Sequence, residues 1–124
     1  MRRPNSIFFN TRIVRVTESL LYCRNLYTNL GLDSDIIVAI RVTHQGLRDR
    51  ELTTSSPNRI VIPETTSEDI CGSELTIHLG DIDKNLHDNV IKLTEPLFVL
   101  FNYKEFPKNV YAGIIDDFVA GKIY

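Results

Sequence analysis

Several features that would assign a function at once are missing from this chain of 124 residues. It has no tryptophan, a single methionine and two cysteines. No apolar run approaches the roughly 20 residues of a membrane-spanning helix, and the basic start lacks the apolar core of a signal peptide. Cys23 and Cys71 show no spacing typical of a disulfide framework, which predicts free thiols in a cytoplasmic protein.

Sequence motifs with known chemistry are missing as well. Neither G-x-x-x-x-G-K-[ST] nor G-x-G-x-x-G occurs, there is no G-x-S-x-G elbow, and the three histidines lack the paired spacing of zinc ligands. The sequence therefore predicts no catalytic residue, no metal site and no cofactor. It leaves the question of an enzyme open and favours a non-catalytic role.

Lysine is missing from the first half of the chain and arginine from the second. Residues 1–59 hold nine arginines against five acidic residues, a formal charge of +4, and residues 60–124 hold five lysines against eleven acidic residues, a charge of −6. Such asymmetry is typical of a phosphate-facing surface. It is equally typical of two surfaces that pack against a partner, or of solvated charge without a role.

The residues that are present indicate a single α+β domain over 1–124. Hydrophobic residues make up 43% and charged residues 24%, which are ordinary values for a globular protein with its own core. Apolar residues spaced three and four apart predict a helix over residues 12–30, capped by Asn10 or Thr11 and ended by Gly31.

Three strands and two more helices are expected after this helix. Alternating, β-branched segments predict strands over 36–43, 59–62 and 74–79, and their short connections favour antiparallel pairing. Helices are predicted over 82–101 and 108–120. The predicted fold is a three-stranded, mainly antiparallel sheet packed with about three helices, in the order α-β-β-β-α-α.

Two further predictions concern the second helix and the core. Pro96 should kink or break that helix, and the apolar run 97–101 should be deeply buried. The following residues should be almost fully buried: Leu20, Ile40, Ile77, Leu93 and Phe118.

The strongest candidate for a ligand or partner site is the loop after the first predicted strand. His44 ends the apolar face of that strand, Gly46 permits unusual backbone angles, and Arg48 and Arg50 follow. Arginine offers forked donors that fit phosphates and carboxylates. The candidate residues are Arg41, His44, Gln45, Gly46, Arg48, Arg50 and Arg59. Alternatively, the arginines pair with acidic residues and hold the loop in place.

Five segments together resemble a known family. These are LLY at 20–22, LY at 26–27, LGLD at 30–33, VTHQGL at 42–47 and LFVLF at 97–101. They are similar to the C-terminal region of bacterial Schlafen/AlbA-like ATP-binding or RecG-related proteins, over about residues 7–121. The resemblance implies that nucleotide-binding or DNA-contacting motifs would lie upstream of this chain, so it assigns no functional residue here.

Three functions remain open at this point. The favoured one is a non-catalytic accessory or interaction domain, excised from a larger bacterial protein, whose partner is the rest of that protein or another protein. The second is a small-ligand or phosphate-ester enzyme that uses the loop from His44 to Arg50. The third is a nucleic-acid-binding module, disfavoured because the second half is acidic and the predicted polar sheet face has no stacking aromatics. No membrane partner is expected.

Overall fold

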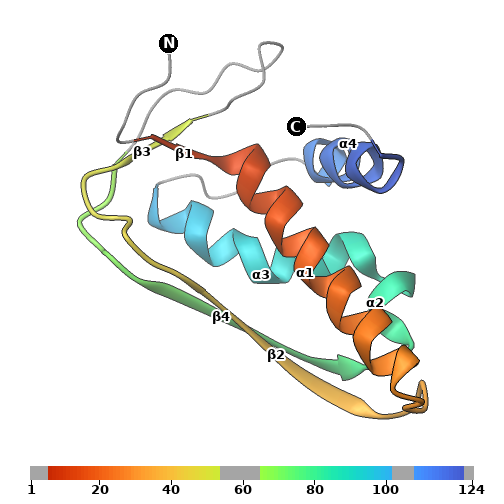
Figure 1. Ribbon diagram of the computed structural model, residues 1–124. Coiled ribbons are helices and arrows are strands. Elements are labelled where there is room, and N and C mark those ends of the chain that lie inside the picture. Colours follow the sequence, from red (N-terminus) through yellow and green to blue (C-terminus); the bar gives the residue numbers. More distant parts are fainter. Residues whose placement is uncertain (1–5, 54–64, 102–107, 122–124) are drawn as a thin grey trace.

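The computed structural model describes residues 6–53, 65–101 and 108–121. Over these ranges the chain is a mixed α+β structure with four helices and two sheets of two strands each (Figure 1). In chain order the elements are β1 (Ser6–Phe8), α1 (Phe9–Asn29), β2 (Ile37–His44), β3 (Glu51–Thr53), β4 (Cys71–His78), α2 (Asp81–Lys84), α3 (Leu86–Leu100) and α4 (Lys108–Val119). None of the helices in these ranges combines the length and apolar character needed to cross a membrane.

Strands β2 and β4 form a long antiparallel ribbon. All eight residues of each strand are paired, and the ribbon ends with His44 opposite Cys71. This confirms the two strands predicted over 36–43 and 74–79. Residues of β2 alternate between more exposed and more covered positions, so one face of the ribbon lies against the helices and the other faces solvent.

The predicted three-stranded antiparallel sheet is wrong for the described part of the chain. The second sheet there is a parallel pair of short strands, β1 and β3, with Ser6 opposite Glu51 and Phe8 opposite Thr53. Strands of three residues are too short to leave an alternating pattern, so hydrophobic periodicity cannot reveal them. The strand predicted over 59–62 lies outside the described residues.

Helix α1 confirms the helix predicted over 12–30, but it begins three residues earlier. Phe8 before it has an extended backbone and makes no side-chain capping bond. Asn10 lies buried inside the helix, so the capping role predicted for Asn10 or Thr11 is wrong. At the other end Gly31 has a φ of 83°, the left-handed conformation expected of a residue that ends a helix.

The helix predicted over 82–101 is divided at Asn85 and continues through Pro96. Asn85 has a φ of −119° and a ψ of 35°, outside the helical region, and it separates α2 from α3. Asn89 Nδ2 donates to the carbonyl of Ile82 at 3.3 Å and so satisfies one end of α2. Pro96 stands at an exposed position of α3, where water can reach the carbonyl that its missing amide leaves unpaired. The break predicted at Pro96 is therefore wrong.

The core forms between the covered face of the ribbon and α3, and between α3, α1 and α4. Figure 1 shows α3 lying along the ribbon with α1 crossing it. Leu20 and Leu93 are 1% and 0% exposed, as predicted. Ile40, Ile77 and Phe118 are only partly buried, so the prediction of nearly full burial is wrong for them. Ile40 and Ile77 lie on the ribbon, and a sheet of two strands is too narrow to shield their inward side chains from the solvent at its edges.

The apolar run at residues 97–101 is buried only in part. Leu97, Phe98 and Phe101 face the core, whereas Val99 is 47% exposed. A helix turns through 3.6 residues, so consecutive residues of a helix packed on one side must point in different directions. The predicted burial of the whole run is therefore wrong.

Candidate functional site

The loop between β2 and β3, which holds most of the predicted site residues, is fixed against the segment before β4. Leu47 is fully buried, and its amide donates to the carbonyl of Asp69 at 3.1 Å. The amide of Asp49 donates to the carbonyl of Thr66 at 3.0 Å. Gly46 has a φ of 69°, the left-handed conformation for which glycine is suited. These contacts therefore hold the loop in a defined conformation against the segment before β4.

His44 lies at the end of β2 on its covered face and is 2% exposed. Its Nε2 is 3.4 Å from the carbonyl oxygen of Leu93 in α3, a contact in which Nε2 carries the hydrogen and donates. Burial lowers the pKa of His44, the bond to Leu93 raises it in part, and the charge of Arg12 lowers it further. At neutral pH the imidazole is therefore uncharged, with a lone pair on Nδ1.

Arg12, in the first turn of α1, acts through its charge on His44, and Arg50, just before β3, acts in the same way on Arg12. Both are half-buried, and Arg50 Nη1 donates to the carbonyl of Gly46 at 3.4 Å. Burial, and then the positive charge of Arg50, lower the pKa of Arg12. The sequence analysis missed Arg12. The sequence feature that could have pointed to Arg12 is its position four residues before Val16, at the edge of the apolar stripe of α1.

The other predicted residues do not join this cluster. Arg41 projects from the solvent face of the ribbon, where its Nε donates to Glu74 Oε1 at 3.0 Å. Arg48 is exposed, and its Nε donates at 3.1 Å to a backbone carbonyl of the segment before β4. Arg48 thus holds the loop through a carbonyl. Gln45 is exposed, and Arg59 lies outside the described residues.

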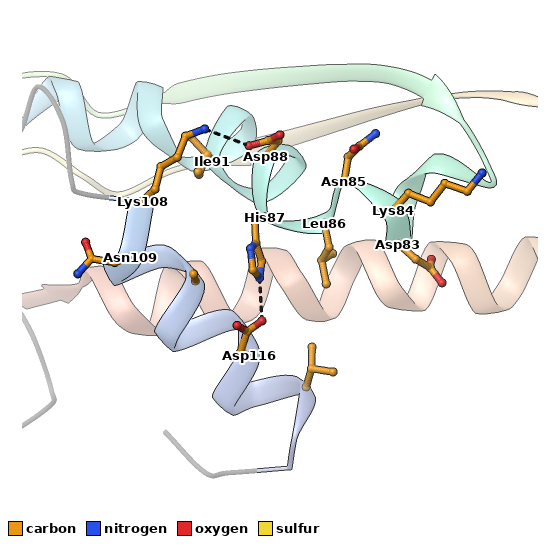
Figure 2. Close-up of a pocket in the computed structure, with 12 residues that line it drawn as sticks. Asp83, Lys84, Asn85, Leu86, His87, Asp88, Ile91, Lys108, Asn109 and Asp116 are labelled. Atoms are coloured by element: carbon orange, nitrogen blue, oxygen red, sulfur yellow. Dashed lines mark hydrogen bonds and ion pairs between the residues drawn. The ribbon is translucent and has the colours of Figure 1, made fainter.

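A separate groove of about 570 Å³ lies between α3 and α4, and Figure 2 shows the residues that line it. This volume is in the range of small-ligand sites. Two side-chain contacts cross from one helix to the other. His87 Nε2 is 2.7 Å from Asp116 Oδ1, and Lys108 Nζ is 3.7 Å from Asp88 Oδ1. His87 and Asp116 are 29 positions apart in the chain, so no local pattern in the sequence connects them.

The groove has the volume of a small-ligand site, but the described residues that line it offer no hydroxyl or thiol nucleophile. The described residues along it include no serine, threonine or cysteine that His87 could activate as a nucleophile. The side chains of His87 and Asp116 are 43% and 65% exposed, so water competes for both. An exposed pair of this kind contributes about 0–1 kcal/mol to stability. We interpret the His87–Asp116 and Lys108–Asp88 contacts as links that hold α3 and α4 together.

A third feature is an exposed apolar surface where α1, the following turn and the start of β2 meet. Figure 1 shows this junction at one extremity of the ribbon, away from β1 and β3. Three side chains, those of Tyr22, Leu30 and Ile37, are 65%, 66% and 63% exposed. The apolar end, as we call this surface, consists of Tyr22, Leu26, Leu30, Leu32, Ile36 and Ile37.

Comparison with protein-family models, with curated proteins and with solved structures finds no match to this chain. The resemblance to Schlafen/AlbA-like proteins therefore stays a prediction. Within residues 6–53, 65–101 and 108–121, no three His, Cys, Asp or Glu side chains gather closely enough to hold a metal ion. A function must be argued from the surfaces described above.

Proposed function

We propose that this chain is a non-catalytic interaction domain of a larger bacterial cytoplasmic protein, and that it binds a protein partner through the apolar end. The exposure of six large apolar side chains at one junction of the fold supports this proposal. Exposed apolar patches with a polar rim are typical of protein-binding surfaces. Tyr22 and Leu26 on α1, and Leu30 directly after the helix, are four residues apart, the spacing of anchors on a helix that binds a partner.

The charges beside the apolar end define the chemistry of the partner. Asp33 and Asp35 lie in the turn between α1 and β2, and both are exposed. Neither forms an ion pair with any residue that the structure describes. The surface that fits this end is therefore a folded protein surface with an apolar centre and lysine or arginine at its rim. The same carboxylates disfavour a nucleic acid there.

A photo-crosslinking residue at position 30 of the full-length protein would identify the partner in cells. The same residue at position 99 is the control, because Val99 is also exposed and apolar but lies on α3. We expect one protein domain to be crosslinked from position 30 and not from position 99. With that domain purified, Leu30→Asp should weaken binding about tenfold or more, because it places a charge in a desolvated contact. Val99→Asp should bind like the wild type.

Two outcomes would contradict the proposal. One is a set of crosslinks that does not differ between positions 30 and 99. The other is a purified partner that binds Leu30→Asp as tightly as the wild type. Light scattering adds a further check, since a dimer that Leu30→Asp dissociates would make a second copy of the chain the occupant instead.

A further inference from the structure

The outer edge of β2 is open in the described chain. Among the described residues β2 pairs with β4 alone. Beside the first pair of the ribbon, the amide of Leu79 donates to the carbonyl of Ile36 at 2.8 Å. Because the residues of an antiparallel strand direct their amide and carbonyl alternately to its two sides, the even-numbered residues of β2 bond to β4. The four odd-numbered residues direct these groups outward, away from β4: Ile37, Ala39, Arg41 and Thr43.

The apolar side chains on the covered face of β2 are left half-covered at the same edge. Helix α3 packs mainly against β4 and much less against β2. Ile40 and Leu75 lie opposite each other on the ribbon, yet Leu75 is 6% exposed whereas Ile40 is only partly buried. Val38 and Val42 are partly buried in the same way. A further strand along this edge would remove more of their apolar area from water, which is favourable.

Strand β2 also lacks the features that normally prevent an edge strand from pairing. Natural edge strands carry proline, lysine, a bulge or an inward-pointing charge. Residues 37–44 contain no proline, glycine or lysine, and their pairing with β4 is continuous, without a bulge. Arg41 points to the solvent face, where its Nε donates to Glu74 Oε1 at 3.0 Å. Strand β4 contains Gly72 and Glu74, so β2 is the edge better suited to accept another strand.

A second copy of β2 fits this edge in one antiparallel register. When Ile40 lies opposite the second copy's Ile40, Val38 lies opposite the second copy's Val42 on the covered face. On the solvent face Ala39 lies opposite the second copy's Arg41, and all the outward-pointing residues exchange backbone hydrogen bonds. A shift of two residues one way places Arg41 opposite Arg41, where like charges repel. The same shift the other way leaves Thr43 without a partner in the second strand.

We propose that two copies of this chain associate through β2 in this register and form a continuous antiparallel sheet of four strands, in the order β4-β2-β2-β4. The contact is two-fold symmetric, and α3 of each copy packs mainly against β4, one strand away from it. Because Ile37 lies opposite the second copy's Thr43, the two apolar ends lie at opposite extremities of the shared sheet. The dimer therefore presents the apolar end twice, and its formation does not depend on the partner proposed for that end.

Sedimentation equilibrium of the purified chain over a concentration series tests the proposal, and we expect a reversible equilibrium between monomer and dimer. Ala39→Pro removes an outward-pointing amide and keeps the ladder to β4. It should weaken dimerisation about tenfold or more, because the symmetry removes two hydrogen bonds between the copies at once. The matched control is Thr76→Pro, since Thr76 lies directly opposite Ala39 and directs its amide to the outer edge of β4. This variant should change the dissociation constant by less than about twofold.

Hydrogen exchange of the wild type provides a measurement that needs no substitution, and it decides if the proline variants fail to fold. The amides of Ala39 and Arg41 should exchange slowly at concentrations where the dimer forms and quickly where the chain is monomeric. The amides of Glu74 and Thr76, on the outer edge of β4, should exchange equally fast at both concentrations.

Four results would overturn the proposal. They are a chain that stays monomeric at every concentration, a dimer that Thr76→Pro weakens as much as Ala39→Pro, exchange of the β2 amides that does not depend on concentration, and a dimer that Leu30→Asp dissociates. If the β2 amides became protected only when another protein is added, an extended segment of that protein would be the occupant instead. Leu30→Asp should leave the dimer unchanged, so the β2 edge and the apolar end can fail separately.

Discussion

Burial governs the titration of several single side chains in this protein. It lowers the pKa of His44 below its ordinary value and raises the pKa of Tyr111 to about 12. Burial also raises the pKa of Cys71, which stands opposite His44 on β4. The end of the ribbon near α3 therefore favours the uncharged forms of His44 and Cys71.

The free energy of unfolding should fall as the pH drops below about 6.5, the ordinary pKa of histidine. The folded-state pKa of His44 lies lower, through burial first and then the charge of Arg12. The unfolded chain therefore binds a proton more readily. This contribution is fully present above the unfolded pKa and is lost as the pH falls through the window below it, by at most about 1.4 kcal/mol per pH unit. Cys71, which stands opposite His44, stays a neutral thiol in this window because burial raises its pKa.

Urea unfolding between about pH 7.5 and pH 5.5 measures this dependence. His44→Gln provides the comparison, because it keeps a polar side chain at the position but has no charge to gain. The stability difference between the wild type and His44→Gln should become smaller toward low pH. Equal pH slopes in the two proteins would show that His44 does not titrate differently on folding.

The sequence predicts the burial of those residues whose environment follows from the spacing of apolar residues nearby in the chain. The stripe of α1 placed Leu20 in the core, and alternation along β2 placed His44 on the covered face. Arg12 was missed because its partners come from β2 and from the loop after it, which no local pattern connects to α1. Ile40 was predicted too deeply buried because alternation identifies a face but not how many strands cover it.

At the scale of elements, α3 contains the one proline within the described helices and keeps it at the surface. Pro96→Ala should raise the free energy of unfolding by about 1–3 kcal/mol. Alanine restores the amide that can donate to the exposed carbonyl four residues earlier. Part of this gain is offset because the proline restricts the unfolded chain. Urea unfolding with Glu95→Ala as the control measures the effect, and a less stable Pro96→Ala would mean that the proline supports α3.

The long elements were predictable, whereas the short ones and the exact breaks were not. Periodicity over many residues identified α1, α3, α4 and both strands of the ribbon. Strands β1 and β3 have three residues each and are defined by pairing between distant segments. The division at Asn85 was assigned to Pro96 because proline is the stronger breaker in isolation, yet the packing of α2 and the bond from Asn89 decide the position.

Across the whole molecule, stability depends on the layer in which α3 lies between the ribbon and α1. Leu93 at the centre of α3 is fully buried, so Leu93→Ala should lower the free energy of unfolding by about 2–5 kcal/mol through lost burial and a cavity. Val99→Ala on the exposed side of α3 should change it by less than about 0.5 kcal/mol. Thermal or urea unfolding of the two variants checks this, and similar losses in both would place the core elsewhere.

The candidate sites differ in how far the sequence could locate them. The loop from His44 to Arg50 was found because a strand end, a glycine and two arginines are adjacent in the chain. The groove between α3 and α4 joins His87 to Asp116 across two helices, and no local pattern relates them. The sequence did not reveal the apolar end. Leu30 continues the apolar stripe of α1 in sequence, which suggests burial, but it lies beyond the residues that α3 covers.

The pairing of β1 with β3 brings two distant parts of the chain together, so the chain between them forms a closed loop. Ser6 and Glu51 are neighbours in space although 45 positions separate them, so α1 and β2 are enclosed in a ring of chain. The ring is closed by a few backbone hydrogen bonds and not by a covalent link. Closing so long a loop costs conformational entropy that three paired residues repay only in part. Among the contacts of the described chain, the pairing of β1 with β3 is therefore one that local unfolding should release early.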